Sequence, residues 1–239
     1  MPEDGYFGEE VAARYDESVA EMFDRSAVEP VVDVLAELAG GGRALELGVG
    51  TGRIALPLAA RGVPVHGIEL SRAMAARLRE KPGGEAIEVT IGDFATATVE
   101  GTFSLAYLVF NTINNLTTQE AQVACFRNVA RHLESGGAFV IEVGVPQLQR
   151  VPPGETMHVF DSSDDHWGID QYDVADQGLV SHHFSVVDGR VERLSIPFRY
   201  VWPAELAGLQ LRDRWAGWRR EPFTSESRQH VSVWERPAG

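Results

Sequence analysis

The sequence predicts a doubly wound α/β fold that carries an inserted antiparallel β subdomain. Between residues 43 and 143, short apolar segments alternate with amphipathic ones, which is the pattern of strands connected by helices. Three glycines follow the first of these strands, at positions 48, 50 and 52. After Val145 the rhythm changes to short alternating segments, and Asp188-Gly189 between two of them is a strong hairpin signal.

Two amphipathic helices are expected before the first strand, over residues 9–24 and 28–39. Apolar residues recur at helical spacing in the first segment, and Tyr15 lies on that apolar stripe. In the second segment Pro30 falls in the first turn, where a helix tolerates proline. The run of glycines at 40–42 then provides a strong stop.

The alternating region predicts five strands and three helices. Strands are expected over residues 43–47, 63–68, 86–91, 104–110 and 138–143, and helices over 53–60, 71–79 and 117–133. Because these strands are apolar on both faces, we expect a parallel sheet that helices cover on both sides.

Beyond residue 145 the pattern favours antiparallel strands. They are expected over residues 158–160, 178–187 and 190–200, and a final pair over 209–216 and 230–235 would complete the main sheet. The predicted organisation has three parts, namely N-terminal lid helices with the ligand-binding core (1–145), the inserted subdomain (146–202) and the closing strands (203–239).

The glycine-rich turn has the features of a ligand cradle. Glycine permits positive φ angles and lets the backbone approach a ligand closely. The N-terminus of the following helix offers free N–H donors and a positive dipole end, which suit a carboxylate or a phosphate. In dinucleotide-binding turns the third glycine comes one residue later, at the position that Arg53 occupies here. A tight turn without a ligand is the alternative.

Carboxylates at the ends of the next two strands extend this candidate site. Glu69 ends the second strand, 19 residues after Gly50, where an adenosine ribose would present its two hydroxyls. At the end of the third strand, Asp93 can accept from an adenine amino group while Phe94 packs near the ring. Taken alone, a strand-end glutamate or a Gly-Asp turn also fits ordinary surface structure.

Four segments, taken in order, resemble the class I S-adenosylmethionine-dependent methyltransferases. They are Glu46-Leu-Gly-Val-Gly-Thr-Gly52, Gly67-Ile-Glu-Leu-Ser71, Gly92-Asp-Phe94 and Leu133-Glu-Ser-Gly-Gly137. The resemblance implies a Rossmann-like, seven-stranded methyltransferase sheet, with S-adenosyl-L-methionine as cofactor and S-adenosyl-L-homocysteine as product. The strands of the insertion are similar to the extra β-subdomain of sugar N,N-dimethyltransferases.

The resemblance also implies a role for each cofactor-binding candidate. Glu46 and the three glycines would surround the methionine moiety, and Glu69 would bind the ribose. Leu70, Met74, Asp93 and Phe94 would lie around the adenine, and Tyr15 is similar to an N-terminal tyrosine that closes over the cofactor carboxylate. The full set of candidates is Tyr15, Glu46, Gly48, Gly50, Gly52, Arg53, Glu69, Leu70, Met74, Asp93, Phe94 and Phe110.

Candidate catalytic residues should lie at the carboxyl ends of the strands, facing the cofactor. Asn111 follows the fourth strand, and Glu142 lies near the end of the fifth, where an unpaired buried acid would be costly. His182 lies in an expected strand of the insertion and could act as a base. The alternatives are turn formation for Asn111, a solvated strand end for Glu142 and a structural role for His182.

Candidate substrate-binding residues are Asn114 and Asn115 after the fourth strand, and Arg199 and Tyr200 at the end of the insertion. The two amides belong to a dense polar run that suggests a lined cavity. An arginine beside aromatic residues could shape an acceptor pocket, or could pack between two lobes. The histidines and acids of residues 158–166 match no established ligand spacing, so no metal is expected.

Composition excludes several classes of protein. The chain has 21 Lys and Arg against 35 Asp and Glu, a net charge of −14, which disfavours a nucleic-acid partner. No apolar run approaches the roughly 20 residues of a membrane span, the acidic N-terminus is unlike a secretory signal, and one cysteine cannot form a disulfide framework. We expect a cytoplasmic protein with a small-molecule partner and no membrane contact, with a homodimer as one option for its assembly.

The leading functional hypothesis is methyl transfer from S-adenosylmethionine to an oxygen or nitrogen of a small molecule, such as a natural product or an amino sugar. Residues 155–176 hold seven acids and no Lys or Arg, so they would attract a cationic substrate. Two alternatives stay open. One is an NAD(P)-dependent oxidoreductase, which the early third glycine disfavours, and the other is a catalytically inactive regulatory module that binds S-adenosylmethionine.

Overall fold

The computed structural model describes residues 5–203 and 209–237 and contains two sheets. The larger has seven strands in the order β10-β11-β5-β4-β1-β2-β3. Its strands are β1 (Ala44–Leu47), β2 (Val65–Glu69), β3 (Glu88–Ile91), β4 (Phe103–Leu108), β5 (Leu133–Gly144), β10 (Gln210–Trp215) and β11 (Gln229–Glu235). Strands β1 to β5 are parallel, whereas β11 is antiparallel to both β5 and β10.

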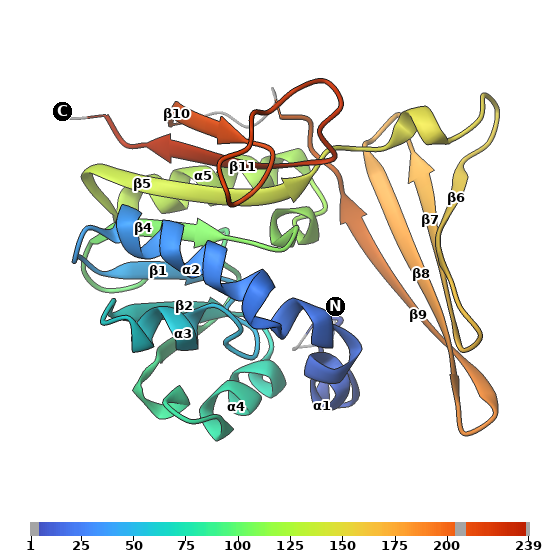
Figure 1. Cartoon of the computed structure of the whole chain (residues 1–239), viewed down its shortest axis with the longest axis horizontal. Coiled ribbons are helices and arrows are strands. Elements are labelled where there is room, and N and C mark those ends of the chain that lie inside the picture. The colour runs from blue at the N-terminus through green and yellow to red at the C-terminus, as the bar shows by residue number, and fades with distance from the viewer. Residues whose placement is uncertain (1–4, 204–208, 238–239) are drawn as a thin grey trace.

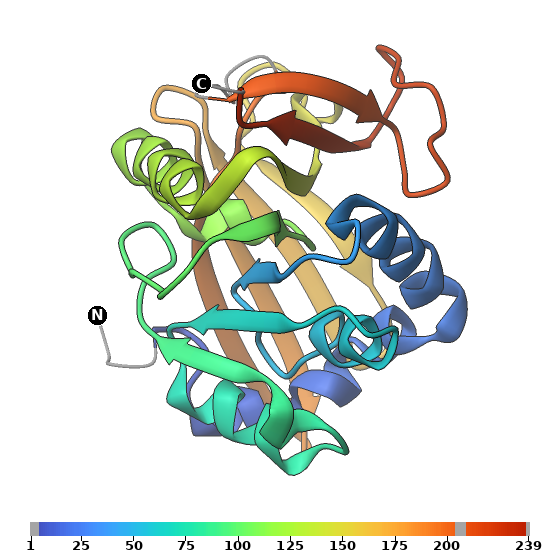
Figure 2. The ribbon, with the colours of Figure 1, turned by 90° about the vertical axis from the view of Figure 1, so that its left-hand side faces the viewer.

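Helices cover both faces of this sheet, as Figure 2 shows. The helices are α1 (Glu9–Ser18), α2 (Arg25–Ala39), α3 (Ala55–Ala60), α4 (Arg72–Glu80) and α5 (Gln119–His132), with short 3₁₀ helices η1 (Ala20–Phe23), η2 (Gly84–Ala86), η3 (Thr112–Asn115) and η4 (Leu148–Arg150). Leu35 of α2 and Leu58 of α3 pack on one face, and Phe126 of α5 packs on the other, edge-on to Phe139. The two-sided burial explains why the strands are apolar throughout.

The second sheet has four antiparallel strands in the order β6-β7-β8-β9. They are β6 (Met157–Ser162), β7 (His166–Asp173), β8 (Gly178–Val187) and β9 (Arg190–Arg199). The β8–β9 turn uses Asp188 and Gly189, both with positive φ, which is the conformation that a two-residue hairpin requires. In Figure 1 this sheet stands opposite the carboxyl ends of the parallel strands.

The expected strand alternation, the hairpin and the antiparallel pair that completes the main sheet are confirmed. Three local differences appear. The first expected helix is divided into α1 and η1, and the strand expected at 138–143 already begins at Leu133 as part of β5. The third is β7, a strand that the sequence does not predict. Its inner side chains are polar, so it lacks the alternation of apolar and polar residues that indicates a strand.

Residues 204–208, which follow the expected boundary at 202/203, lie outside the described residues. Within the described ranges, none of the helices is both long and apolar enough to cross a bilayer.

Candidate cofactor and acceptor site

The glycine-rich turn leaves β1 and is fixed by two close contacts. Its φ angles are +71° at Gly48, +56° at Gly50 and +85° at Gly52. A Cβ added at Gly48 would lie 2.7 Å from Thr112 Cγ2, so η3 packs directly against the turn. On β2, a Cβ added at Gly67 would lie 2.6 Å from Val49. The turn is therefore held between β2 and η3 with its backbone in conformations that favour glycine.

Glu69 is locked to this turn by backbone hydrogen bonds. The Gly50 N–H donates to Glu69 Oε2 (2.8 Å), and the Ser71 N–H donates to Oε1 (2.9 Å). Ser71 also caps α4, because its hydroxyl accepts from the Met74 N–H (3.0 Å). The carboxylate thus has a fixed orientation at the carboxyl end of β2, next to the glycine backbone.

Glu46 lies one strand away and is almost fully buried. The Tyr107 hydroxyl donates to Glu46 Oε2 (2.8 Å). Burial raises the pKa of Glu46 to about 8, against the opposing effects of this hydrogen bond and of Arg53. Arg53 lies over the Phe110 ring, 5.1 Å from its centroid, and donates to the Met22 carbonyl (3.3 Å). A carboxyl that holds its proton at neutral pH therefore lies behind the turn.

Tyr15 brings α1 against the same region. Its ring meets Phe7 edge-on at 6.1 Å and packs with Met74 of α4. Burial raises the pKa of the Tyr15 hydroxyl, and the charges of Arg53 and Glu69 also act on it. The Tyr15 hydroxyl therefore lies near Arg53 and Glu69, and its part in cofactor binding stays a prediction.

A second set of contacts joins α1 to the glycine turn. The Thr51 hydroxyl donates to Asp16 Oδ1 (2.5 Å), and Lys81 forms an ion pair with the other oxygen of Asp16. Lys81 also donates to the Thr51 carbonyl (2.8 Å), and its ammonium lies over the Phe23 ring. We call Asp16, Thr51 and Lys81 the α1 clasp, because they connect α1, the turn and the end of α4.

The residues expected around the adenine follow the ends of β2 and β3. Leu70 is exposed, whereas Met74 is buried. Asp93 accepts a hydrogen bond from the Ala95 N–H (2.8 Å), and Phe94 is buried beside it. The structure therefore gathers these side chains at one end of the sheet, with Asp93 also serving as a turn residue.

The candidate catalytic residues after β4 and β5 hold each other in place. Phe110 and Asn111 both have positive φ angles. The Phe110 N–H donates to Glu142 Oε2 (2.9 Å), and the Trp218 indole N–H donates to Oε1 (2.8 Å). Asn111 Oδ1 accepts from the Gly144 N–H (2.6 Å). These partners fit the turn-forming alternative for Asn111. Glu142 is not a solvated strand end, because both of its carboxylate oxygens accept hydrogen bonds. The catalytic roles of Asn111 and Glu142 stay predictions.

Asn114 and Asn115 lie on η3, between the glycine turn and β9. Asn115 donates to the Thr112 carbonyl (3.1 Å), which is local helix structure. Asn114 Oδ1 is buried and has no hydrogen-bond partner within residues 5–203 and 209–237. A buried carbonyl without a donor is costly, so Asn114 is the amide of this pair that fits a ligand-binding role.

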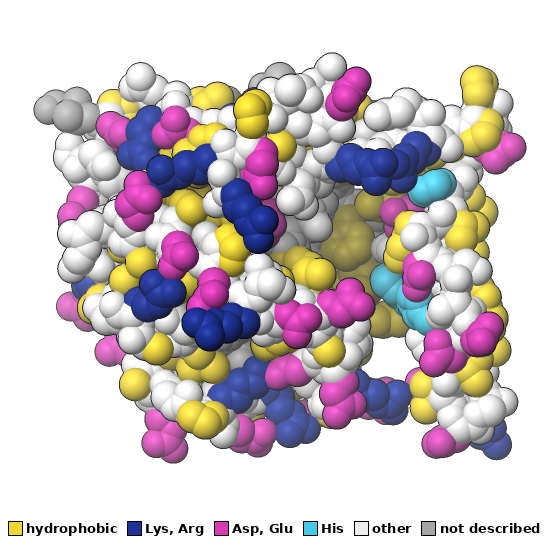
Figure 3. Space-filling view, viewed as in Figure 1, with side chains coloured by type: hydrophobic (Ala, Val, Ile, Leu, Met, Phe, Trp, Pro, Cys, Tyr) yellow, Lys and Arg dark blue, Asp and Glu magenta, His cyan; other side chains and the backbone are white. Residues whose placement is uncertain are grey.

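The four-stranded sheet has two faces, which the register separates. The residues of its inner face include His166, Asp170, Tyr172, Ser181, His183 and Ile196. Tyr172, Ser181 and Ile196 are buried, and Glu192 on the same face approaches Arg14 of α1 (3.6 Å). In Figure 3 histidine side chains line the wall of the hollow between the two sheets.

His182 lies on the outer face, with Gln171 and Ser195 as its hydrogen-bond partners. His182 is the predicted base, but its side chain points away from the hollow. Its neighbour His183 lies on the inner face. A strand turns successive side chains to opposite faces, and only the register decides which of the two histidines faces inward.

Comparison with known proteins identifies the family to which the chain belongs. Residues 44–137 match the family described as a methyltransferase domain. The whole chain is 34% identical to the solved CcbJ methyltransferase from Streptomyces caelestis, with a TM-score of 0.85 and 99% of each chain covered. The chain belongs to the class I S-adenosylmethionine-dependent methyltransferases. This membership sets aside the oxidoreductase alternative.

Two further relatives extend the comparison. The chain is 28% identical to the cypemycin N-terminal methyltransferase of a Streptomyces species, over 93% of this chain and 97% of that one. It shares its fold with the S-adenosylmethionine-bound amino pentose methyltransferase CalS10 of Micromonospora echinaspora, with 20% identity, a TM-score of 0.64, and 92% of this chain and 96% of that one covered.

S-adenosylmethionine is the cofactor of this methyltransferase family, and the residues present fit it. The glycine turn exposes backbone next to a fixed carboxylate, Glu69, which suits a ligand with paired hydroxyls. The buried carboxyl of Glu46, with its pKa raised to about 8, lies at the end of β1 behind the turn. When bound, the cofactor supplies a methyl carbon activated by sulfonium charge. Among the described residues no group of three or more His, Cys, Asp and Glu is arranged to hold a metal ion.

Arg199 and Tyr200 of this methyltransferase connect its two sheets. Arg199 is buried and donates to Gln122 of α5 (2.5 Å) and to Gln177 (2.6 Å). Tyr200 is also buried, with its ring 6.0 Å from that of Tyr172. These contacts favour the packing alternative for Arg199, while Tyr200 touches a residue of the inner face.

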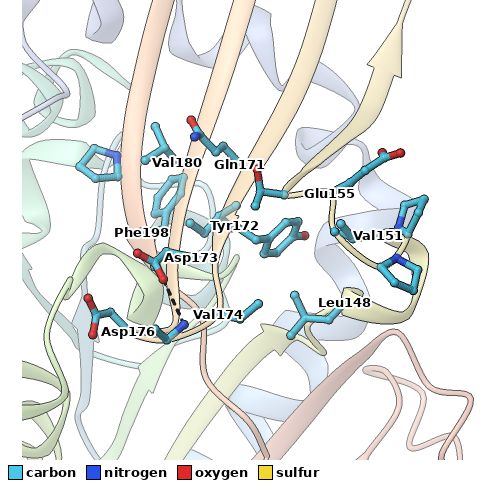
Figure 4. A pocket seen from close by; sticks show the side chains of 18 of the residues that line it. Leu148, Val151, Glu155, Gln171, Tyr172, Asp173, Val174, Asp176, Val180 and Phe198 are labelled. Carbon is cyan, nitrogen blue, oxygen red and sulfur yellow. Dashed lines mark hydrogen bonds between the residues drawn. The ribbon is translucent and has the colours of Figure 1, made fainter.

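A separate cavity of about 890 Å³ lies at one end of the four-stranded sheet. Figure 4 shows Leu148 and Val151 from the segment after β5 beside Tyr172 and Phe198 from the strands. Acids at its rim include Asp173, which accepts from the Ala175 N–H. None of the candidate cofactor-binding residues lines it, so it is distinct from the glycine turn.

Proposed function

We propose that this methyltransferase transfers the methyl group of S-adenosylmethionine to the nitrogen of an amine on a small molecule or peptide. The observation that carries the proposal is the acidic, histidine-bearing inner face opposite the carboxyl ends of β1, β4 and β5. Asp161, Asp170 and Glu192 contribute carboxylates to it. An amine is cationic in water, so such a wall attracts it, whereas an alcohol gains nothing from the charge.

The names of the relatives support nitrogen as the acceptor atom. One is an N-terminal methyltransferase and another acts on an amino pentose. The two acceptors differ in size but share a basic aliphatic nitrogen. Amines of both kinds, amino sugars and peptide N-termini, are therefore the proposed acceptor class.

The chain's own residues would have three tasks in this reaction. The glycine turn and Glu69 orient the cofactor, so that the methyl carbon lies in line with the acceptor nitrogen. The inner face binds the amine and takes up its proton, because only a neutral nitrogen has the lone pair to attack. The α1 clasp holds α1 over the site, which excludes water from the transfer step.

The test uses methyl-labelled S-adenosylmethionine and four probes: trialanine, N-acetyltrialanine, methyl glucosaminide and methyl glucoside. Label should enter at least one of the two amines and neither of their amine-free counterparts. Methylation of the glucoside would show oxygen as the acceptor atom and overturn the proposal. Cofactor binding by calorimetry together with no methylation of any probe would favour the inactive binding module.

A further inference from the structure

Three strands of the inner face bring together a continuous chain of polar side chains. His166 Nδ1 on β7 lies 2.6 Å from Asp161 Oδ2 on β6. His166 Nε2 lies 3.2 Å from His183 Nδ1 on β8, and His183 Nε2 lies 3.4 Å from the Ser181 hydroxyl. No motif in the sequence joins these residues, which are up to 22 positions apart, because strand pairing alone assembles them.

The chain runs from the surface into the hollow. The Asp161 side chain is 49% exposed and that of His166 is 28% exposed, whereas Ser181 is buried. The Phe160 ring meets His183 edge-on at 5.5 Å. It can lie there only because residue 168 is glycine, since a Cβ at Gly168 would be 2.2 Å from the ring. The Phe160 ring thus shields His183 on one side, while the outer end of the chain reaches water.

The hydrogen bonds decide which ring nitrogen of each histidine carries the proton. An ionised Asp161 accepts from His166 Nδ1–H, which leaves His166 Nε2 as an acceptor. His183 must then donate through Nδ1–H, which leaves its Nε2 with a lone pair. The Ser181 hydroxyl also bonds to the Asp170 carboxyl, so its proton has that carboxyl as a partner. His183 Nε2 is therefore the basic end of the chain.

We propose that His183 is the catalytic base of the methyl transfer, with His166 and Asp161 as positioning residues that carry its proton to solvent. The inference rests on the proposed amine acceptor. The acceptor N–H proton passes to His183 Nε2, and the nitrogen lone pair forms the N–C bond as the C–S bond breaks. His183 Nδ1–H passes its proton to His166 Nε2, and His166 Nδ1–H passes its proton to Asp161. Starting from the cationic amine, the products are the methylated ammonium, S-adenosylhomocysteine and a protonated Asp161, which releases its proton to water.

The electrostatics of the cluster fit a base. Burial lowers the pKa of His183 below the ordinary value of 6.5, and His166 beside it adds to the effect. Asp161 on β6 acts in the opposite direction, and His182 on its own strand lowers the pKa further. From β9 the residue opposite is Leu194, which carries no charge. His183 is therefore neutral near pH 7, which is the form that can accept a proton.

A matched pair of variants tests the base with the methyl acceptor that the wild type uses, trialanine or methyl glucosaminide. We expect His183→Gln to lower kcat by about 100-fold or more, the usual contribution of a general base, with little change in KM. The acidic limb of the kcat–pH profile should disappear. His182→Gln, one residue away on the outer face, should keep kcat and an acidic limb. That limb should move to slightly higher pH, because His182 no longer lowers the His183 pKa. A larger loss in His182→Gln, or an unchanged acidic limb in His183→Gln, overturns the proposal.

Two further measurements test the base. One uses a substitution at the exposed end of the chain, and the other uses the unmodified protein and needs no acceptor. In Asp161→Asn, a change at the exposed end, the acidic limb should move to lower pH, because the charge that raises the His183 pKa is gone. Imidazole nitrogen NMR of the unmodified protein should find His183 neutral at pH 7 with its proton on Nδ1. The Nε2–H form would refute the base even if no probe is methylated. Failure of every probe would count against the proposed function alone.

Discussion

At the scale of single residues, the carboxyl groups of the site differ because their surroundings differ. Glu69 accepts two backbone N–H bonds, from Gly50 and Ser71. Glu46 is fully buried and accepts from the Tyr107 hydroxyl and the Ala55 backbone N–H, and burial outweighs both hydrogen bonds and raises its pKa to about 8. We therefore expect two glutamates at the ends of adjacent strands to act differently toward the cofactor, Glu69 as a hydrogen-bond acceptor and Glu46 as a group that can release a proton.

Binding of S-adenosylmethionine should release a proton from Glu46. The folded-state pKa of about 8 keeps the carboxyl mostly neutral at pH 7, and a cationic group placed beside it favours ionisation. Calorimetry in buffers of different ionisation enthalpy should find up to about one proton released per cofactor between pH 5 and 8. Glu46→Gln, which keeps an acceptor for Tyr107, should bind with no such release. Equal release by both proteins would place the proton elsewhere.

The glycine turn and the carboxylate at the end of β2 could be predicted from the sequence, because both belong to one local strand–turn–helix unit. The surroundings of Glu142 could not. Its partner Trp218 is 76 residues away, and no local pattern indicates that the indole returns to β5. The sequence also cannot distinguish His182 from His183, because only the strand register decides which of two successive side chains faces inward.

At the scale of elements, α1 combines a small apolar contact with charged attachments. Ala12 is its only buried residue among those described, and Tyr15 packs beside it against Met74. The α1 clasp adds an attachment through the one lysine of the chain. A helix held in this way can open without disturbing the main core, which is the behaviour expected of a lid.

Lys81→Met should loosen α1 and weaken cofactor binding while the main fold stays intact. The variant loses a partly exposed ion pair and a bond to the Thr51 carbonyl, together worth about 1 kcal/mol, or about a fivefold rise in Kd. Hydrogen exchange over residues 9–18 should be faster than in the wild type and should slow when S-adenosylhomocysteine is added. Arg61→Met removes an exposed ion pair with Asp33 and serves as the control. Equal exchange with and without ligand would make α1 a fixed part of the core.

At the scale of the whole molecule, two apolar clusters on the two faces of the main sheet hold the fold together. The alternation of strands and helices predicts this layer structure, because two-sided burial leaves a strong apolar signal in each strand. The inserted sheet was predicted less completely. Its inner face carries polar side chains, so β7 lacks the apolar pattern by which strands are recognised.

Acid should destabilise the protein through His230, which is fully buried on β11. Its Nδ1 lies 2.8 Å from the Ser232 hydroxyl, and burial lowers its pKa to about 4. The unfolded chain binds the proton at a higher pH, near 6.5. The contribution of neutral His230 to the free energy of unfolding is therefore fully present above about pH 6.5. It is lost as the pH falls toward 4, which lowers the free energy of unfolding by about 3 kcal/mol.

Urea unfolding of the wild type and of His230→Gln at pH 7, 6, 5 and 4 measures this contribution. The variant should show a shallower fall in the free energy of unfolding over that range. His182→Gln, at a more exposed histidine, should follow the wild-type slope. Parallel slopes for all three proteins would assign the acid sensitivity to the carboxylates instead.

The position of β11 between β5 and β10 affects how the chain is made. Residues 138–143 of β5 are nearly all buried, yet one of their edges is paired only by β11. During synthesis about 85 residues, including the whole second sheet, emerge between the two strands. The nascent protein therefore presents an apolar strand edge for several seconds, and such an edge recruits other chains. A fragment that stops before Gln210 should associate with itself in light-scattering measurements, although it contains every residue of the cofactor site.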